Sequence, residues 1–259
     1  MQRIVRKRSP WPKTMSWATS GIAAAAAAYA GYVGTTWLLY GRPSRPTEDE
    51  SDPLLDRFIP EYDVVDRHCI RVNAPAAMTL DVARDMELSH LPIVRMIFKA
   101  RELILRARRD DTPRPKGLLD EVLSLGWSVL AEVPGREIVV GAVTKPWEPN
   151  VTFRSIPSAE FASFAEPDYV KIVWTLRADP TSDTTSIFRT ETRALATDPV
   201  ARSKFRRYWS LLSPGIRLIR RLTLRPLKSA AERLAWEARH AELPLAQEQP
   251  RECEFHDTH

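Results

Sequence analysis

The strongest constraint on the fold is a long N-terminal stretch without charge. No Asp, Glu, Lys or Arg occurs between Thr14 and Gly41, and about 20 apolar residues in a helix suffice to cross the hydrocarbon core of a bilayer. Tryptophan and tyrosine side chains lie near both ends of the stretch, where aromatic residues usually meet the membrane interfaces. We therefore predict one transmembrane helix over residues 14–41.

Two other interpretations of this stretch stay open. A cleaved signal peptide would use the basic head of residues 1–13, the run Ala23 to Ala28 and a small-residue site at Ala28-Tyr29-Ala30. The apolar character continues beyond that site to Tyr40, which favours an uncleaved anchor. A soluble alanine-rich helix is the third interpretation, and it has to explain the missing charges on every face.

The charges that flank the stretch predict its orientation. Five cations precede it, whereas two follow it and are succeeded by the acidic residues Glu48, Asp49, Glu50 and Asp52. Positive charge is retained in the cytoplasm. We expect a single-pass protein of the cell membrane, with its basic head in the cytoplasm and its folded domain outside.

The overall basic character does not indicate nucleic-acid binding. The sequence pI is about 9.3, but seven of the 38 Lys and Arg residues lie in the first 45 residues, where no acid occurs. The remainder holds 31 cations against 33 acids, a net charge of −2, so a basic nucleic-acid-binding domain is not expected. Two cysteines, Cys69 and Cys253, are too few for a disulfide framework and lack metal-ligand spacing. We interpret them as unpaired thiols; one pair would require an oxidising compartment.

The rest of the chain reads as a linker, one domain and a tail. Residues 42–61 contain four prolines and an acidic cluster, which predicts an exposed linker. The domain should cover residues 62–240, and residues 241–259 have few apolar groups and should form a mobile tail.

The hydrophobic periodicity of the domain changes three times along the chain. Alternation predicts a first strand over 64–72, and helical spacing then predicts two helices and a short third one. A Pro134-Gly135 turn between two β-rich runs predicts a hairpin, and three more strands precede a final helical region with interruptions at Ser213-Pro214-Gly215 and at Pro226. The expected helices cover 75–86, 91–108, 118–125 and 199 to about 240, and the expected strands cover 64–72, 127–133, 136–144, 151–156, 169–178 and 186–197.

This order of elements, together with the strands Tyr169-Val-Lys-Ile-Val-Trp-Thr-Leu-Arg177 and Phe188-Arg-Thr-Glu-Thr-Arg193, resembles the START-like helix-grip superfamily. That superfamily (SRPBCC) includes pollen-allergen-type proteins, polyketide cyclases and lipid-transfer domains. The resemblance covers roughly residues 62–235 and implies an α+β fold, in which a curved antiparallel sheet wraps around a long C-terminal helix and holds an apolar ligand against it. The family shares no fixed catalytic set, so no functional residue is transferred. The interruptions of the final helix depart from the usual pattern.

The sequence lacks the common short motifs for phosphate binding, metal binding and nucleophilic catalysis. It contains no glycine-rich phosphate loop, H-E-x-x-H, C-x-x-C or G-x-S-x-G, and we expect neither a metal nor a cofactor. His68 shares a strand face with apolar residues and could act as an acid/base or as a polar contact to a ligand, although a structural histidine is commoner. Asp66 and Glu191 could serve as a general base, but cross-strand ion pairing on a solvated face is the simpler account.

The alternation along two strands predicts an apolar lining for a ligand more readily than a catalytic site. Side chains on one face of two strands, together with the apolar row of the final helix, would enclose a ligand, although ordinary core packing uses the same residues. The predicted ligand-binding residues are His68, Ile172, Trp174, Leu176, Phe188, Thr190, Thr192, Tyr208, Leu212 and Ile216.

The final helical region carries a basic stripe. Between Pro199 and Ala231 there are nine cations and no acid, and a basic amphipathic helix can lie on an anionic membrane surface. The predicted membrane-surface residues are Arg217, Arg221, Arg225 and Lys228. A core-facing helix with a solvated basic side is the alternative.

Together these patterns favour a membrane-anchored domain that binds an apolar or lipid-like molecule. A cyclase- or dehydratase-like enzyme that uses the same cavity, and an interaction module with a filled core, are the alternatives. The expected partners are the bilayer and the ligand, without nucleic acid.

Overall fold

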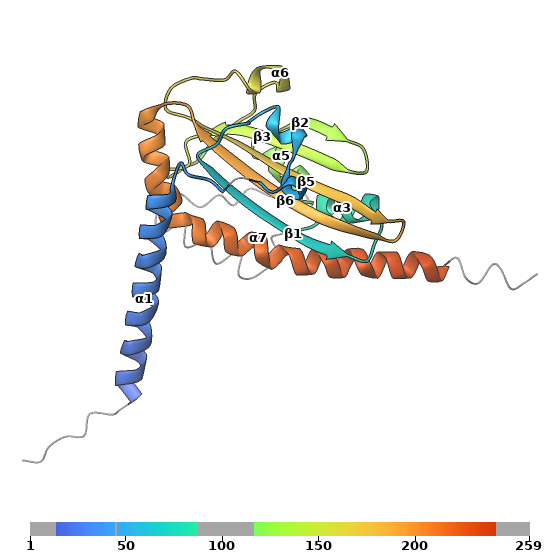
Figure 1. The fold of residues 1–259 in the computed structure, drawn as a ribbon, viewed down its shortest axis with the longest axis horizontal. Helices are drawn as coiled ribbons and strands as arrows, with labels where there is room; N and C mark the ends of the chain where they lie inside the picture. The colour runs from blue at the N-terminus through green and yellow to red at the C-terminus, as the bar shows by residue number, and fades with distance from the viewer. Residues whose placement is uncertain (1–13, 45, 88–116, 242–259) are drawn as a thin grey trace, which may run out of the picture.

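The computed structural model describes residues 14–44, 46–87 and 117–241 (Figure 1). Its centre is a six-stranded antiparallel sheet in the order β1-β6-β5-β3-β2, with the short β4 beside β3. The strands are β1 (Val64–Val72), β2 (Ser128–Val133), β3 (Glu137–Thr144), β4 (Phe153–Arg154), β5 (Val170–Ser182) and β6 (Thr185–Ala196). The predicted strands and the Pro134-Gly135 hairpin are confirmed, except that the strand expected over 151–156 shrinks to the two residues of β4.

Helices complete an α+β fold, as predicted. They are α1 (Thr14–Leu39), the 3-10 turn η1 (Glu48–Glu50), α2 (Pro53–Asp56), α3 (Ala76–Asp85), α5 (Leu118–Ser124), α6 (Ser158–Phe161) and α7 (Pro199–Ala241). The helix predicted over 91–108 and the predicted tail from residue 242 onward lie outside the described residues.

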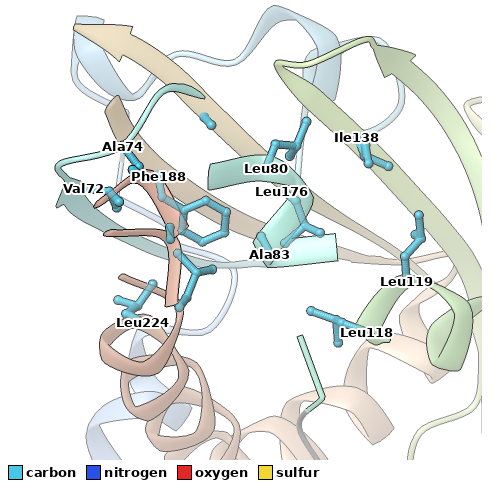
Figure 2. Packing of buried hydrophobic residues seen from close by; sticks show 14 of the residues in the cluster. Val72, Ala74, Leu80, Ala83, Leu118, Leu119, Ile138, Leu176, Phe188 and Leu224 are labelled. Atoms are coloured by element: carbon cyan, nitrogen blue, oxygen red, sulfur yellow. The ribbon is translucent and has the colours of Figure 1, made fainter. Parts of the chain in front are cut away.

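The inner face of the sheet packs against α7, α3 and α5. Alternate residues of each strand point to this face, and they join apolar side chains of the three helices in the largest buried cluster, which Figure 2 shows. Burial of each Leu or Phe in such a cluster contributes about 1.5 to 3 kcal/mol. Its members include Val72, Leu80, Leu119, Ile138, Leu176, Phe188 and Leu224.

The outer face of the sheet is also covered. Leu55, Phe58 and Ile59 are buried there and form a second cluster with side chains of β3, β5 and α6; the rings of Phe58 and Phe161 meet edge to face at 6.2 Å. The prediction of an exposed linker over 42–61 is therefore wrong for its second half. The physical reason is that burying these three apolar side chains against the sheet is favourable enough to hold a proline-rich segment in place.

α7 is one helix of 43 residues with Pro214 and Pro226 inside it, so the predicted interruptions do not end it. Instead, α7 bends: its first part runs beside α1, and the remainder crosses beneath the sheet (Figure 1). A proline inside a helix removes a backbone donor and crowds the preceding turn, which is the usual cause of a sharp bend. Ser213 contacts Tyr32 of α1 and Arg217 contacts Asp66 of β1, so Pro214 and Gly215 lie between the two parts.

α1 is apolar and long enough to cross a membrane between Ser20 and Leu39, where its mean hydropathy is 1.3. A signal sequence at the N-terminus has the same character. The C-terminal part of α1 also contacts α7: the Tyr29 hydroxyl donates to the Leu211 carbonyl at 2.6 Å, Tyr32 Oη lies 3.0 Å from Ser213 Oγ, and Arg206 donates to the Trp37 carbonyl. Residues 20–30 of α1 are exposed.

Candidate functional site

Polar side chains gather on the inner face of the sheet, between two apolar regions. Strand register places Asp66 opposite Thr192 and Thr192 opposite Trp174, while the next row holds His68 opposite Thr190. Arg217 and Arg220 reach this group from α7. We call the group the polar island; its members are Asp66, His68, Trp174, Thr190, Thr192, Arg217 and Arg220.

Asp66 is the centre of the island. Its side chain is 6 % exposed, and its Oδ2 lies 3.1 Å from His68 Nε2 and 3.6 Å from Arg220 Nε, while its Oδ1 lies 3.5 Å from Arg217 Nε. Burial alone would raise the pKa of Asp66, but the hydrogen bond with His68 and the charges of Arg220 and Arg217 together hold the pKa below its usual value. The carboxylate is therefore ionised at neutral pH.

The aromatic side of the island is built around Thr190. Trp174 Nε1 donates to Thr190 Oγ1 at 2.6 Å, and Arg220 Nη1 lies 3.4 Å from the same oxygen. The Arg220 guanidinium also lies 5.7 Å from the centre of the Trp174 ring, within the range of a cation–π contact. Thr192 Oγ1 and Arg217 Nε are buried without a hydrogen-bond partner among the described residues.

The structure brings four of the ten predicted ligand residues together in the island: His68, Trp174, Thr190 and Thr192. The apolar ones divide between its two sides. Leu176 and Phe188 belong to the large inner cluster, whereas Ile172, Tyr208 and Ile216 pack against a smaller cluster around Phe205 and Trp209. Leu212 is half-buried on α7.

The expected ion pairing on a solvated face is wrong for Asp66, which faces α7 instead. Glu191 does pair with strand arginines, with Arg67 Nε at 2.9 Å and Arg193 Nε at 2.7 Å. However, Glu191 is buried on the outer face, because the segment that contains α2 covers that face. The two carboxylates lie on opposite faces of the sheet, and each face is covered, so the solvated face expected for both is wrong.

The four predicted membrane-surface residues have different surroundings. Arg217 points toward Asp66, and Lys228 Nζ lies 3.6 Å from Glu232 Oε1, one helical turn away. Arg221 and Arg225 are exposed.

Arg220 is the site residue that sequence reasoning missed. A signal was present, because Ile216, Arg220 and Leu224 are spaced four residues apart and therefore share one side of the helix. An arginine in the apolar row of a helix requires a buried partner, and Asp66 is that partner.

A separate open groove of about 730 Å³ lies between α3 and the end of α7. Met78, Val82 and Met86 line one side, with Leu234 and Ala238 on the other, and Asp81, Asp85 and Glu237 also line it. None of the predicted ligand residues contributes to this groove.

Comparison with known proteins gives no family assignment. No family model matches the chain, and no curated protein matches it. Among solved structures, a hypothetical protein from Helicobacter pylori matches with 8 % identity over 73 % of this chain and 99 % of that chain, at a TM-score of 0.36. The norcoclaurine synthase of Thalictrum flavum matches with 13 % identity over 70 % and 98 % of the two chains, at 0.26. A Streptomyces aromatase/cyclase matches with 13 % identity over 65 % and 93 %, at 0.21. With all three TM-scores below 0.5, the α+β assignment depends on the sheet and helices of the chain itself.

Proposed function

We propose that this chain is a membrane-anchored domain that binds an amphipathic, lipid-like molecule with an acidic polar end. The observation that carries this proposal is the polar island between two apolar clusters under α7. The acidic end would meet the island, and the apolar part would lie against the inner-face side chains on either side of it.

The charge of the island favours an acidic group. Among the residues that the structure describes, Arg217 and Arg220 face one carboxylate, Asp66, and a partly buried cation without a full counter-charge is costly. A ligand carboxylate or phosphate would supply that counter-charge and would accept hydrogen bonds from guanidinium donors. Thr192 Oγ1 and Arg217 Nε, which make no hydrogen bond among the described residues, are suited to contact it.

A fluorescent fatty acid tests the proposal. The full chain in detergent should bind the probe, and Arg220→Gln should weaken binding by about tenfold, the effect of losing one charge-assisted hydrogen bond. Arg221→Gln is the matched control, because Arg221 is the next residue and is exposed. A fatty alcohol of equal length should bind both variants alike. Equal binding of the fatty acid to the two variants would contradict the proposal, provided that their melting temperatures show both to be folded.

A second candidate is acid/base catalysis of the cyclase or dehydratase kind. The contact between His68 Nε2 and Asp66 Oδ2, 3.1 Å long, is an arrangement in which a carboxylate orients an imidazole for proton transfer. Mass spectrometry of molecules that co-purify with the full chain and with His68→Gln separates the candidates. If the chain only binds its ligand, the same molecule should co-purify with the parent and with the variant. If the chain catalyses dehydration, the variant should retain a precursor whose mass exceeds that of the parent's molecule by one water.

A further inference from the structure

The outward side of α7 combines exposed leucines with exposed arginines. After the bend of α7, Leu218 and Leu222 are 42 % and 36 % exposed, and they lie on the same side of the helix as Arg221 and Arg225, which are exposed too. We call these four residues the Leu–Arg face.

A single exposed leucine on a soluble protein is ordinary, but the Leu–Arg face repeats the combination over two successive turns. No Asp or Glu occurs between Pro199 and Ala231, so the helix offers the arginines no acid along this length. A helix side with leucines and arginines and no acid has the composition of one that lies in the interface of an anionic bilayer.

The position of α1 indicates which side of the domain a membrane would meet. Tyr29 and Tyr32 of α1 contact Leu211 and Ser213 of α7, just before α7 bends. From there α7 runs across α1 and under the sheet, while α1 continues past it, away from the sheet (Figure 1). A bilayer that α1 crosses would therefore face the outward side of α7, and tyrosine is a residue that favours this level of the membrane.

We propose that the Leu–Arg face rests in the headgroup layer of an anionic bilayer, with the part of α7 after Pro214 lying along the surface at the level of Tyr29 and Tyr32. The inference depends on α1 being inserted and does not depend on the ligand proposed above. Docking in this way would bring Arg217 and Arg220 of the polar island close to the lipid surface, because they lie on the same turns of α7 as Leu218 and Arg221.

Depth-dependent quenching tests the docking. The full chain, in a Cys69→Ser, Cys253→Ser background, carries one fluorophore at Leu222→Cys. The control carries it at Asp183→Cys, in the exposed turn between β5 and β6. Both proteins are reconstituted with lipids that bear a shallow nitroxide quencher. Position 222 should be quenched strongly in vesicles with acidic lipids, and position 183 should not. Salt at 1 M, where the Debye length is about 3 Å, should remove most of the quenching. Equal quenching at both positions would overturn the proposal.

A second variant separates docking from folding. Leu218→Gln with Leu222→Gln removes the apolar part of the face, and a fluorophore at Ser229→Cys, also exposed on α7, reports the depth. Loss of quenching with an unchanged melting temperature is expected. Quenching at the parent's level would mean that the leucines do not enter the bilayer.

Discussion

Glu137 and Asp52 bring two carboxyl groups together on the outer face of the sheet, where both residues are buried. Asp52 caps α2 by accepting from the backbone of Leu54 and Leu55 at 3.1 and 3.0 Å, and the Thr175 hydroxyl donates to Glu137 Oε1 at 3.1 Å. Burial and the neighbouring Asp52 raise the pKa of Glu137 to about 8. At neutral pH, Glu137 therefore holds a proton that Asp52 can accept in a hydrogen bond.

This pair predicts a dependence of stability on pH. Because the pKa of Glu137 is higher in the folded chain, the contribution of its proton is fully present below the unfolded value of about 4.5 and is lost as pH rises toward 8. Glu137→Gln keeps the hydrogen bonds without the ionisation, so its melting temperature should fall less than the parent's between pH 5 and 9. Thermal melts of both full chains in one detergent measure this. Parallel pH profiles would show that Glu137 does not titrate in this range.

Trp174 allows a direct measurement of inner-face packing. Its ring packs against the large inner cluster, and its indole donates to Thr190. Trp174→Ala should reduce the free energy of unfolding by about 3 kcal/mol, the lower end of the range for a large aromatic because the ring is partly exposed. Trp236→Ala is the control, because that side chain is 55 % exposed and should lose less than about 0.5 kcal/mol. Similar losses for the two variants in chemical denaturation would contradict this packing.

At the scale of elements, strand faces were predictable and helix surroundings were not. Side chains alternate along a strand regardless of what covers it, so His68, Thr190 and Trp174 could be placed on one side of the sheet from the sequence. Arg220 joins them through the rotation of α7 about its axis, which tertiary packing fixes. Leu55 and Ile59 lie in a proline-rich segment without periodicity, so no pattern indicated their burial. Hydropathy reported how apolar α1 is, but not that its second half contacts α7.

The bend of α7 should depend on Pro214. Without that proline the helix can recover its regular hydrogen bonds, and the first part of α7 should then move away from Tyr29 and Tyr32. Pro214→Ala should accelerate backbone hydrogen exchange in residues 32–39 of α1, measured on the full chain in nanodiscs. Pro226→Ala is the control, since residue 226 lies in the part of α7 that crosses under the sheet. Unchanged exchange in both variants would show that Pro214 does not maintain the contact.

For the whole molecule, the position of the membrane along α1 follows from contacts more than from hydropathy. Arg206 donates to the Trp37 carbonyl at 2.9 and 2.6 Å, and its guanidinium lies 4.3 Å from the centre of the Trp37 ring. An arginine in the middle of a bilayer costs about 2.5 to 3.5 kcal/mol or more, so Trp37 should lie outside the hydrocarbon. The segment from Thr14 to Ala28 covers only about 22 Å of helix, against a core of about 30 Å. A span that ends near Tyr29 therefore requires local thinning of the bilayer.

Cysteine accessibility in intact cells tests both this boundary and the proposed orientation. In the Cys69→Ser, Cys253→Ser background, Gly34→Cys and Ala24→Cys lie on the same helix, and both positions are exposed within the protein itself. If the bilayer ends near Tyr29 and the domain is outside, a membrane-impermeant maleimide should label position 34 and leave position 24 unlabelled. Labelling of position 34 only after permeabilisation would place the domain in the cytoplasm. Protection of both positions before and after permeabilisation would mean that lipid covers α1 as far as Leu39, which would require the first part of α7 to separate from it.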